Sequence, residues 1–159
     1  MPAAPASVLT FASVLYAHRS RIWRAITDFD SINDELRPFA TMQAPPGLQR
    51  LDGLAFVPGR PLGRVTLMLA GLVPVGRMEL TLASLAVGEG FVEQSSVSGL
   101  RSWRHERSIE PHPRGTSLVD RLTVEPRIAP AVTCLLVDQL FRHRHRRLRN
   151  RWGGVAVER

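Results

Sequence analysis

The segment 102-SWRHERSIEPHPRGTSLVDRLTVEP-126 decides the fold, because it holds two strand-like stretches and the turn that joins them. Successive side chains of a strand point to opposite faces, so each stretch divides into two sets of residues. One set in each stretch is mainly apolar and is predicted to face the protein interior. These inner sets are Trp103, His105, Arg107 and Ile109 in the first stretch, and Leu118, Asp120, Leu122 and Val124 in the second.

The turn between the two stretches fixes their pairing. Pro113 presets the backbone for a turn and Gly115 can adopt a positive φ, which makes Pro111 and Thr116 the closing pair of an antiparallel hairpin. Counting back from this closure gives the inner pairs Ile109 with Leu118, Arg107 with Asp120, and His105 with Leu122. A slip of two residues would keep the same faces and set the aspartate opposite His105.

Three polar residues, His105, Arg107 and Asp120, are thus expected on an otherwise apolar concave surface. Burying an unpaired charge there would cost several kcal/mol, so they must pair, bind water or face a ligand. The favoured interpretation is a structural salt bridge with a satisfied histidine. The alternatives are a polar anchor for a ligand's carbonyl, hydroxyl or carboxylate, and general acid or base catalysis by His105.

The rest of the chain predicts a strand, two short helices and further strands before the hairpin. Ser31 and Asp34 resemble a capping pair that opens the second helix, and Pro38 ends it. Turn signals separate the strand candidates, and their short connections imply antiparallel pairing. The expected elements are strand 7–16, helices 18–27 and 31–36, a weak strand at LAF (54–56), and strands 64–71, 77–87, 90–98, 102–110 and 116–125.

A long helix is predicted from Pro130 to about Trp152, because this segment has no internal Gly or Pro. Pro130 suits the first turn of a helix and Gly153 suits its end. One helical stripe is expected to pack on the sheet. It comprises Val132, Leu135, Leu136, Gln139, Leu140 and His143.

The order of elements predicts an α+β fold in a single domain over residues 1–159. A curved antiparallel sheet of about seven strands, followed by one long helix, must bury one face against that helix. The chain therefore favours a sheet wrapped around its C-terminal helix, with two short helices after the first strand.

Composition indicates the cellular location of the protein more than its function. The formal net charge is +7, and all 21 basic residues are Arg, which we attribute to the codon bias of a GC-rich genome. The lone Cys134 lies in the apolar run AVTCLLV, which indicates a core residue and a reducing, cytoplasmic location. No stretch approaches the roughly 18 apolar residues of a membrane span, and the N-terminus lacks the pattern of a signal peptide.

The segments RIWRAITDFDSINDELRP (21–38), SWRHERSIEP (102–111) and GTSLVDRLTVEP (115–126) resemble the START-like, birch-pollen-allergen-like helix-grip superfamily, also called SRPBCC. The resemblance covers nearly the whole chain. It implies a cavity between the sheet and the C-terminal helix that binds lipids, sterols or polyketides in various members. Members include polyketide aromatases or cyclases, coenzyme-binding subunits, carriers, receptors and chaperone activators, and the fold alone does not choose among them.

Twelve residues are candidates for ligand binding in such a cavity. Glu35 could project to the pocket mouth beside Leu36 and Trp23, although a solvated helix face is favoured. The face of the third strand is weakly defined, because Met68 lies on the opposite parity from its apolar neighbours. The candidates are Trp103, His105, Arg107, Asp120, Leu122, Leu67, Leu69, Met78, Leu80, Leu82, Glu35 and Leu136. Glu79 and Glu93 are expected to face solvent.

The segment FRHRHRRLRNRW (141–152) is interpreted as a solvated helix end whose cations favour the negative pole of the helix dipole. His143 and His145 are two residues apart and diverge on a helix, so no metal site is expected. The segment has no interleaved stacking platform, so no specific nucleic-acid binding is expected. The sequence has no phosphate-binding loop and no GxSxG elbow, and we expect no cofactor.

The leading hypothesis is therefore a module that binds a hydrophobic small molecule, with the polar inner residues orienting it. The alternative is an enzyme of the aromatase or cyclase type, in which His105 or Arg107 polarises a carbonyl in the same cavity. A third hypothesis is binding of an anionic partner through the Arg-rich helix end. The sequence does not decide the ligand or the oligomeric state.

Overall fold

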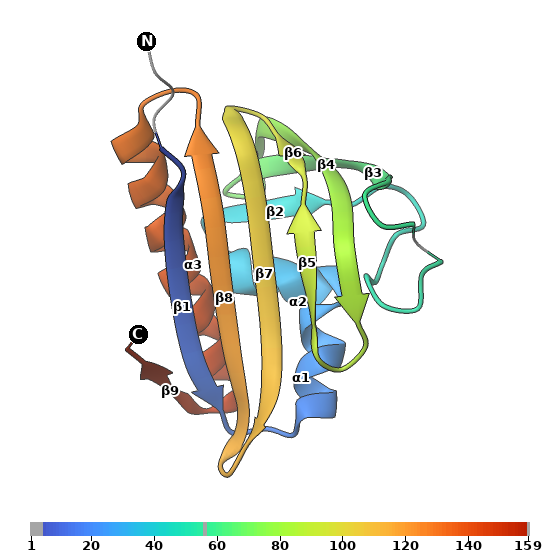
Figure 1. The fold of residues 1–159 in the computed structure, drawn as a ribbon, viewed down its shortest axis with the longest axis vertical. Helices are drawn as coiled ribbons and strands as arrows, with labels where there is room; N and C mark the ends of the chain where they lie inside the picture. Colours follow the sequence, from blue (N-terminus) through green and yellow to red (C-terminus); the bar gives the residue numbers. More distant parts are fainter. Residues whose placement is uncertain (1–4, 56, 159) are drawn as a thin grey trace.

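A computed structural model describes residues 5–55 and 57–158, and it confirms the α+β architecture. A large curved sheet lies against one long helix, and two short helices follow the first strand (Figure 1). The elements are β1 (Ser7–Leu15), α1 (Arg19–Ile26), α2 (Phe29–Leu36), β2 (Ala40–Gln43), β3 (Pro61–Leu69), β4 (Val73–Ala86), β5 (Gly90–Gln94), β6 (Ser96–Val97), β7 (Leu100–His112), β8 (Gly115–Pro126), α3 (Pro130–Trp152) and β9 (Gly154–Val157).

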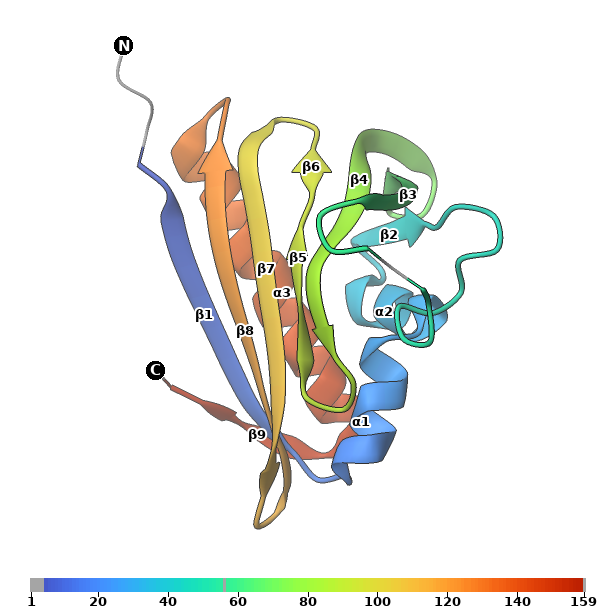
Figure 2. The ribbon, with the colours of Figure 1, turned by 45° about the vertical axis from the view of Figure 1, so that its right-hand side comes forward.

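The sheet is antiparallel and has the strand order β2-β3-β4-β5-β7-β8-β1-β9, with the short β6 paired to β4. α3 lies behind β1, β8 and β7 in Figure 1, on the concave side of the sheet. Figure 2 shows α1 and α2 on the same side, below the strands β2 to β4. α2 contacts α3 and β2, whereas α1 contacts α2 and the strands β7 and β8.

The hairpin of β7 and β8 has the predicted register. Pro111 pairs with Thr116 at the turn, and Arg107 pairs with Asp120 further along the strands. Ile109 faces Leu118 and His105 faces Leu122, as the count from the turn predicts. Turn chemistry and the alternation of side chains were sufficient to fix this pairing.

Two edge strands, β2 and β9, were not predicted. Each has four residues, too few for an alternating pattern to stand out, and each pairs with a single neighbour at one edge of the sheet. The expected strand at LAF is wrong in its first two residues, because Leu54 and Ala55 belong to an irregular loop, and Phe56 lies outside the described residues.

The second helix begins earlier than predicted. Asp28 is the N-cap, and its Oδ2 accepts a hydrogen bond of 2.9 Å from the backbone N–H of Ser31. The serine is thus the capped residue of the first turn rather than the cap, because the carboxylate of Asp28, three positions earlier, accepts its backbone N–H. The helix ends at Leu36, before Pro38, as expected.

α3 has the predicted bounds but buries a different face. Its buried residues are Phe141, Arg144, His145 and Leu148, all in the C-terminal half. The predicted stripe is wrong in the first half, since Leu135 and Leu136 are 58% and 64% exposed. No helix within the described ranges is long and apolar enough to cross a membrane.

The backbone of β5 approaches that of β7 closely at Gly90. A Cβ atom built on Gly90 would lie 2.2 Å from the carbonyl oxygen of Arg107. Gly88, in the same turn, has a φ of +76° and no atom within 4 Å of such a Cβ. The first glycine is needed for space beside Arg107, and the second only for its backbone conformation.

We therefore expect Gly90→Ala to destabilise the fold more than Gly88→Ala. The control should cost about 1–2 kcal/mol for its left-handed backbone. Gly90→Ala should cost roughly 1–3 kcal/mol more, because two strands must separate. Urea unfolding of both variants measures the difference, and equal midpoints would show that the β5–β7 spacing is not tightly set.

Candidate functional site

The hairpin brings the predicted polar residues together on the inner face of the sheet. Arg107 is 1% exposed and Asp120 is fully buried. The guanidinium forms a two-pronged ion pair, with Nε donating to Oδ1 and Nη2 donating to Oδ2, both at 2.7 Å. The cross-strand pair predicted from the register is therefore present and closed to solvent.

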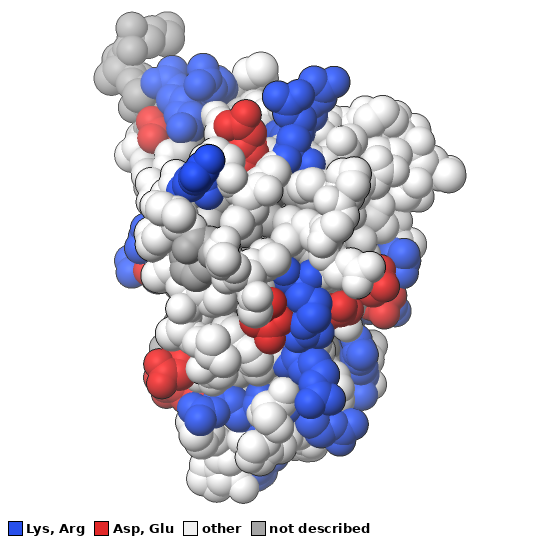
Figure 3. All heavy atoms as spheres, turned by 90° about the vertical axis from the view of Figure 1, so that its right-hand side faces the viewer, with Lys and Arg blue, Asp and Glu red and all other residues white. Residues whose placement is uncertain are grey.

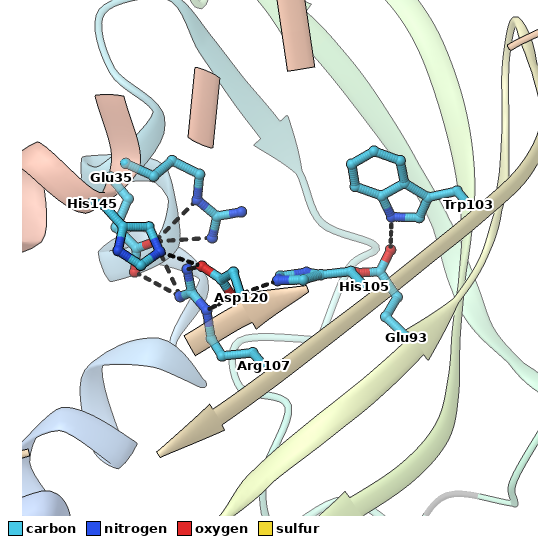
Figure 4. Close-up of polar contacts among 8 residues, drawn as sticks. Glu35, Glu93, Trp103, His105, Arg107, Asp120 and His145 are labelled. Carbon is cyan, nitrogen blue, oxygen red and sulfur yellow. Dashed lines mark hydrogen bonds and ion pairs between the residues drawn. The ribbon is translucent and has the colours of Figure 1, made fainter. Parts of the chain in front are cut away.

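Asp120 is the centre of the cluster (Figure 4). Besides Arg107, it accepts hydrogen bonds from His105 Nε2 to Oδ1 at 2.7 Å and from His145 Nε2 to Oδ2 at 2.9 Å. A carboxylate offers about four lone-pair positions. All of them are occupied by protein donors, so Asp120 has no capacity left for a ligand.

Glu35 closes the other side of Arg107. It accepts a hydrogen bond from Arg107 Nη1 at 3.1 Å, and from Arg144 Nε and Nη2 at 3.0 and 2.9 Å. The expectation of a solvated Glu35 is wrong, because its side chain is 4% exposed. The reason is its place on α2, where the buried face comprises Phe29, Ile32, Glu35 and Leu36.

Arg144 and His145 were missed, since the whole Arg-rich end of α3 was expected to be solvated. Both are buried, at 7% and 2% exposure. Phe141 and Leu148 flank them at spacings of three and four residues, which is the period of one helical face. This spacing was the signal available in the sequence, but the many charged residues around it led to the interpretation of a solvated helix end.

A serine extends the cluster to β1. Ser13 Oγ lies 2.8 Å from His145 Nδ1 and accepts a hydrogen bond of 2.9 Å from Arg149 Nη1. The order serine, histidine, aspartate is that of a catalytic triad, but the two ring nitrogens are exchanged, since Nδ1 rather than Nε2 faces the serine. However, Ser13 has no exposed surface, so no substrate can reach its hydroxyl in this conformation.

A second set of polar contacts, formed by Glu93, Trp103 and His105, lies beside the cluster (Figure 4). Glu93 Oε1 accepts a hydrogen bond of 3.0 Å from Trp103 Nε1, and Glu93 Oε2 lies 3.8 Å from His105 Nδ1. The expectation that Glu93 faces solvent is wrong, because it shares the inner face of β5 with Phe91. Glu79 is exposed, as expected.

The cluster shifts the protonation of its members in opposite directions. Burial opposes ionisation of Asp120, but Arg107 and His105 outweigh it and hold the aspartate pKa well below its usual value. Burial likewise opposes the charged form of His105, but Asp120 and Glu93 outweigh it and raise the histidine pKa. The pKa of Arg107 is raised in the same way by Asp120 and Glu35. The geometry thus favours ion pairs in the interior.

The predicted apolar candidates divide into three groups by accessibility. Met78, Leu80, Leu82 and Leu122 are buried in core clusters, whereas Leu67 and Trp103 are partly buried beside them. Leu69 and Leu136 are more than half exposed. The wall of a ligand site would keep some accessible surface, so the buried group forms filled core in this conformation. The assignment of these residues to a ligand site stays a prediction.

The convex face of the sheet carries a hollow of about 680 Å³ between the β4–β5 turn and β7. Its lining includes Glu106, Ser108 and Arg121, which have the opposite parity from the inner residues. This hollow is open and mixed in charge. It is therefore separate from the space between the sheet and α3.

Comparison with known proteins places the fold. Residues 13–152 match the model of a family described as "Domain of unknown function (DUF8410)". Protein CV1439 from Chromobacterium violaceum is similar at 16% identity and a TM-score of 0.66, over 92% of this chain and 95% of that one. No curated protein matches the sequence.

Two further solved structures have a similar fold. A START superfamily protein from Mycobacterium smegmatis is 18% identical, with a TM-score of 0.61 over 94% of this chain and 97% of that one. Ara h 8.0201 is 10% identical, with a TM-score of 0.62 over 91% and 96%. Such identities show the fold alone, which is the START-like helix-grip fold.

Because Asp120 is buried among cations, Asp120→Ala should destabilise the protein by roughly 3–5 kcal/mol. Asp34→Ala is the matched control, since Asp34 also pairs with an arginine, Arg37, at 2.8 Å but is 51% exposed. That control should cost less than about 1 kcal/mol. Chemical denaturation of both variants tests this. Similar losses of unfolding free energy would mean that burial of the Asp120–Arg107 pair does not raise the cost of removing its carboxylate.

The raised pKa of His105 predicts a pH-dependent contribution to stability. The folded state holds the proton more tightly, so this contribution is full below about pH 6.5 and is lost as the pH rises through the folded pKa. The difference in unfolding free energy between the wild type and His105→Gln should therefore shrink as the pH rises above about 6.5.

His112→Gln, at the tip of the same hairpin, serves as the control for that pH series. Its stability difference from the wild type should change less over the same range. A gap for His105→Gln that stays constant or grows with pH would contradict a protonated, carboxylate-paired His105.

Proposed function

We propose that this chain, which belongs to the family described as "Domain of unknown function (DUF8410)", binds an apolar small molecule between the concave face of its sheet and the N-terminal half of α3. The helix-grip fold supports this proposal, because the superfamily resemblance implies ligand binding in that space. The observation that carries it is an inward-facing apolar band that keeps accessible surface.

That band lies on both the sheet and the helix. On the sheet, Met42, Leu67 and Trp103 are only partly buried although they pack beside core residues. On α3, Val137 and Leu140 are partly buried against the same clusters. Interiors are normally packed without gaps. Accessible apolar surface on two facing elements therefore supports a groove rather than a filled core.

One stripe of α3 contacts α2 only at its C-terminal end, and the proposed groove begins where that contact stops. The residues Leu136, Leu140, His143 and Arg147 lie along one stripe of the helix, spaced by four, three and four residues. At the C-terminal end of the stripe, His143 Nε2 lies 2.6 Å from Arg37 O, and Arg147 Nε donates to Asp34 O at 3.1 Å. The helix then extends beyond α2. Leu140 packs on the core, whereas Leu136, one turn nearer the N-terminus of α3, is 64% exposed.

Exposed apolar residues continue on the opposite wall. In the β3–β4 hairpin, Leu69, Leu72 and Val75 are 54%, 80% and 59% exposed. These strands and the N-terminal end of α3 occupy the same end of the molecule (Figures 1 and 2). Figure 3, viewed from the side of β2 to β4, shows mainly uncharged surface in its upper right part. Clustered exposed apolar residues commonly mark a binding surface.

The competing functions receive less support from the polar residues. Catalysis by Arg107 would require a free donor facing the substrate, and Arg107 is bonded to both Asp120 and Glu35. His105 donates its Nε2–H to Asp120 and keeps only Nδ1, on a side chain that is 4% exposed. Arg144 is not free to bind an anion at the Arg-rich helix end, because it is buried and bonded to Glu35. We therefore propose ligand binding without assigning a reaction.

The neutral fluorescent probe N-phenyl-1-naphthylamine should bind the wild-type protein at a single saturable site, with a blue-shifted emission. An affinity of about 1–10 μM is typical of an apolar probe that is not fully enclosed. Leu136→Asp should weaken binding about tenfold or more, because it places a charge at the groove. The residue is exposed, so folding should be retained.

Val87→Asp is the matched control, since Val87 is 74% exposed in the β4–β5 turn, at the other end of the molecule. It should bind the probe as the wild type does. The proposal would be overturned by a folded wild type that shows no saturable binding, or by equal losses in the two variants.

A further inference from the structure

We infer that the polar end of the proposed ligand site is the gap between Glu93 and His105, and that it selects an apolar ligand carrying a hydroxyl group over one carrying a carboxylate. This inference rests on the proposed function and adds the ligand's chemical class to it. It is carried by the geometry of three side chains, those of Glu93, Trp103 and His105.

The two polar atoms at this gap are spaced so that one oxygen atom can hydrogen-bond to both. Glu93 Oε2 and His105 Nδ1 are 3.8 Å apart, which is too long for a direct hydrogen bond. An oxygen about 2.8 Å from each atom would lie roughly 2 Å to one side of the line that joins them, and there it could bridge the two groups as ordered waters do. A hydroxyl group can donate to the carboxylate and accept from the imidazole at once.

The protonation of His105 favours this arrangement. Its Nε2 faces Asp120 Oδ1 at 2.7 Å and must donate, because the carboxylate can only accept. The raised pKa of His105 favours a second proton on Nδ1, which faces the gap. The gap then presents one donor, His105 Nδ1–H, and one acceptor, Glu93 Oε2.

Glu93 also has unused acceptor capacity and remains accessible. Among the described residues its one hydrogen bond is the bond from Trp103 Nε1 at 3.0 Å. Its side chain is 12% exposed, whereas that of Asp120 is fully buried. Glu93 pairs with Leu82 and His105 and is buried on the same face of β5 as Phe91, so it lies on the concave face of the sheet. The partly buried Trp103 connects it to the apolar band.

A ligand carboxylate would fit this gap poorly. It could accept from His105 Nδ1–H, but it would offer a second negative group to Glu93 and no proton to donate. An uncharged hydroxyl meets both partners without repulsion. The expected ligand is therefore an apolar alcohol or phenol rather than a fatty acid.

The test compares 1-dodecanol with dodecanoate as competitors of N-phenyl-1-naphthylamine. The two molecules share the same chain and differ in the end group. Dodecanol should displace the probe from the wild type at a concentration at least about tenfold lower, since hydrogen bonds to charged groups are strong. Glu93→Gln should reduce the dodecanol-to-dodecanoate ratio to within about threefold, while Glu79→Gln, on an exposed glutamate, should leave it unchanged.

A direct measurement on the wild type keeps the inference testable if Glu93→Gln does not fold. Dodecanol should shift the NMR signal of the Trp103 indole N–H, which is assigned by Trp103→Phe, more than dodecanoate does. If the apolar probe does not bind the wild type, the proposed function fails. If it binds but the ratio is the same in the wild type and Glu93→Gln, or the indole signal does not move, only the present inference fails.

Discussion

The buried carboxylate of Asp120 is the interaction on which the rest of the structure depends. It lies on β8 and accepts hydrogen bonds from two residues of β7 and from His145 of α3. A buried carboxylate is tolerated only when its charge is compensated in place. Because one of its donors belongs to the helix, packing α3 against the sheet and satisfying this charge are a single event.

The buried acidic and basic side chains around Asp120 alternate in sign. Asp120 is bonded to Arg107, Arg107 to Glu35, and Glu35 to Arg144, so every charge neighbours an opposite one. This chain passes through β8, β7, α2 and α3 and therefore joins every layer of the fold. Such networks contribute little net stability compared with an apolar core, but a missing member leaves its neighbour uncompensated. We therefore regard the network as a constraint on geometry first.

The sequence predicted the strand half of this network because strands have a period of two and the turn at Pro113 and Gly115 sets the register. The helical half was missed for a physical reason. A helix places its inner residues three or four apart, so the buried Arg144 and His145 stand in the sequence among exposed arginines. Glu35, which was expected to be solvated, follows the exposed Asp34. In an Arg-rich run, the buried arginine differs from the others only by its spacing from Phe141 and Leu148.

Glu93 was missed for a related reason, because β5 has five residues and gives little alternation from which to assign a face. The apolar face of α3 was also misjudged. The sequence shows a continuous apolar stripe and places the end of α2 at Leu36, but it cannot show that α2 lies opposite only the C-terminal half of that stripe. Which part of an apolar surface is core and which part is open depends on where the opposing element ends.

The uneven packing of α3 connects the buried network to the proposed ligand site. The C-terminal half of the helix is held by Arg144 and His145, whereas Val132 and Leu136 in the N-terminal half are largely exposed. Segments with few buried contacts open at low free-energy cost. One end of the helix can therefore adjust to a bound molecule while the other keeps the cluster intact. Because Asp120 and Arg107 are already satisfied, polar recognition at the proposed ligand site would come from the edge of the cluster, where Glu93 keeps free acceptor capacity.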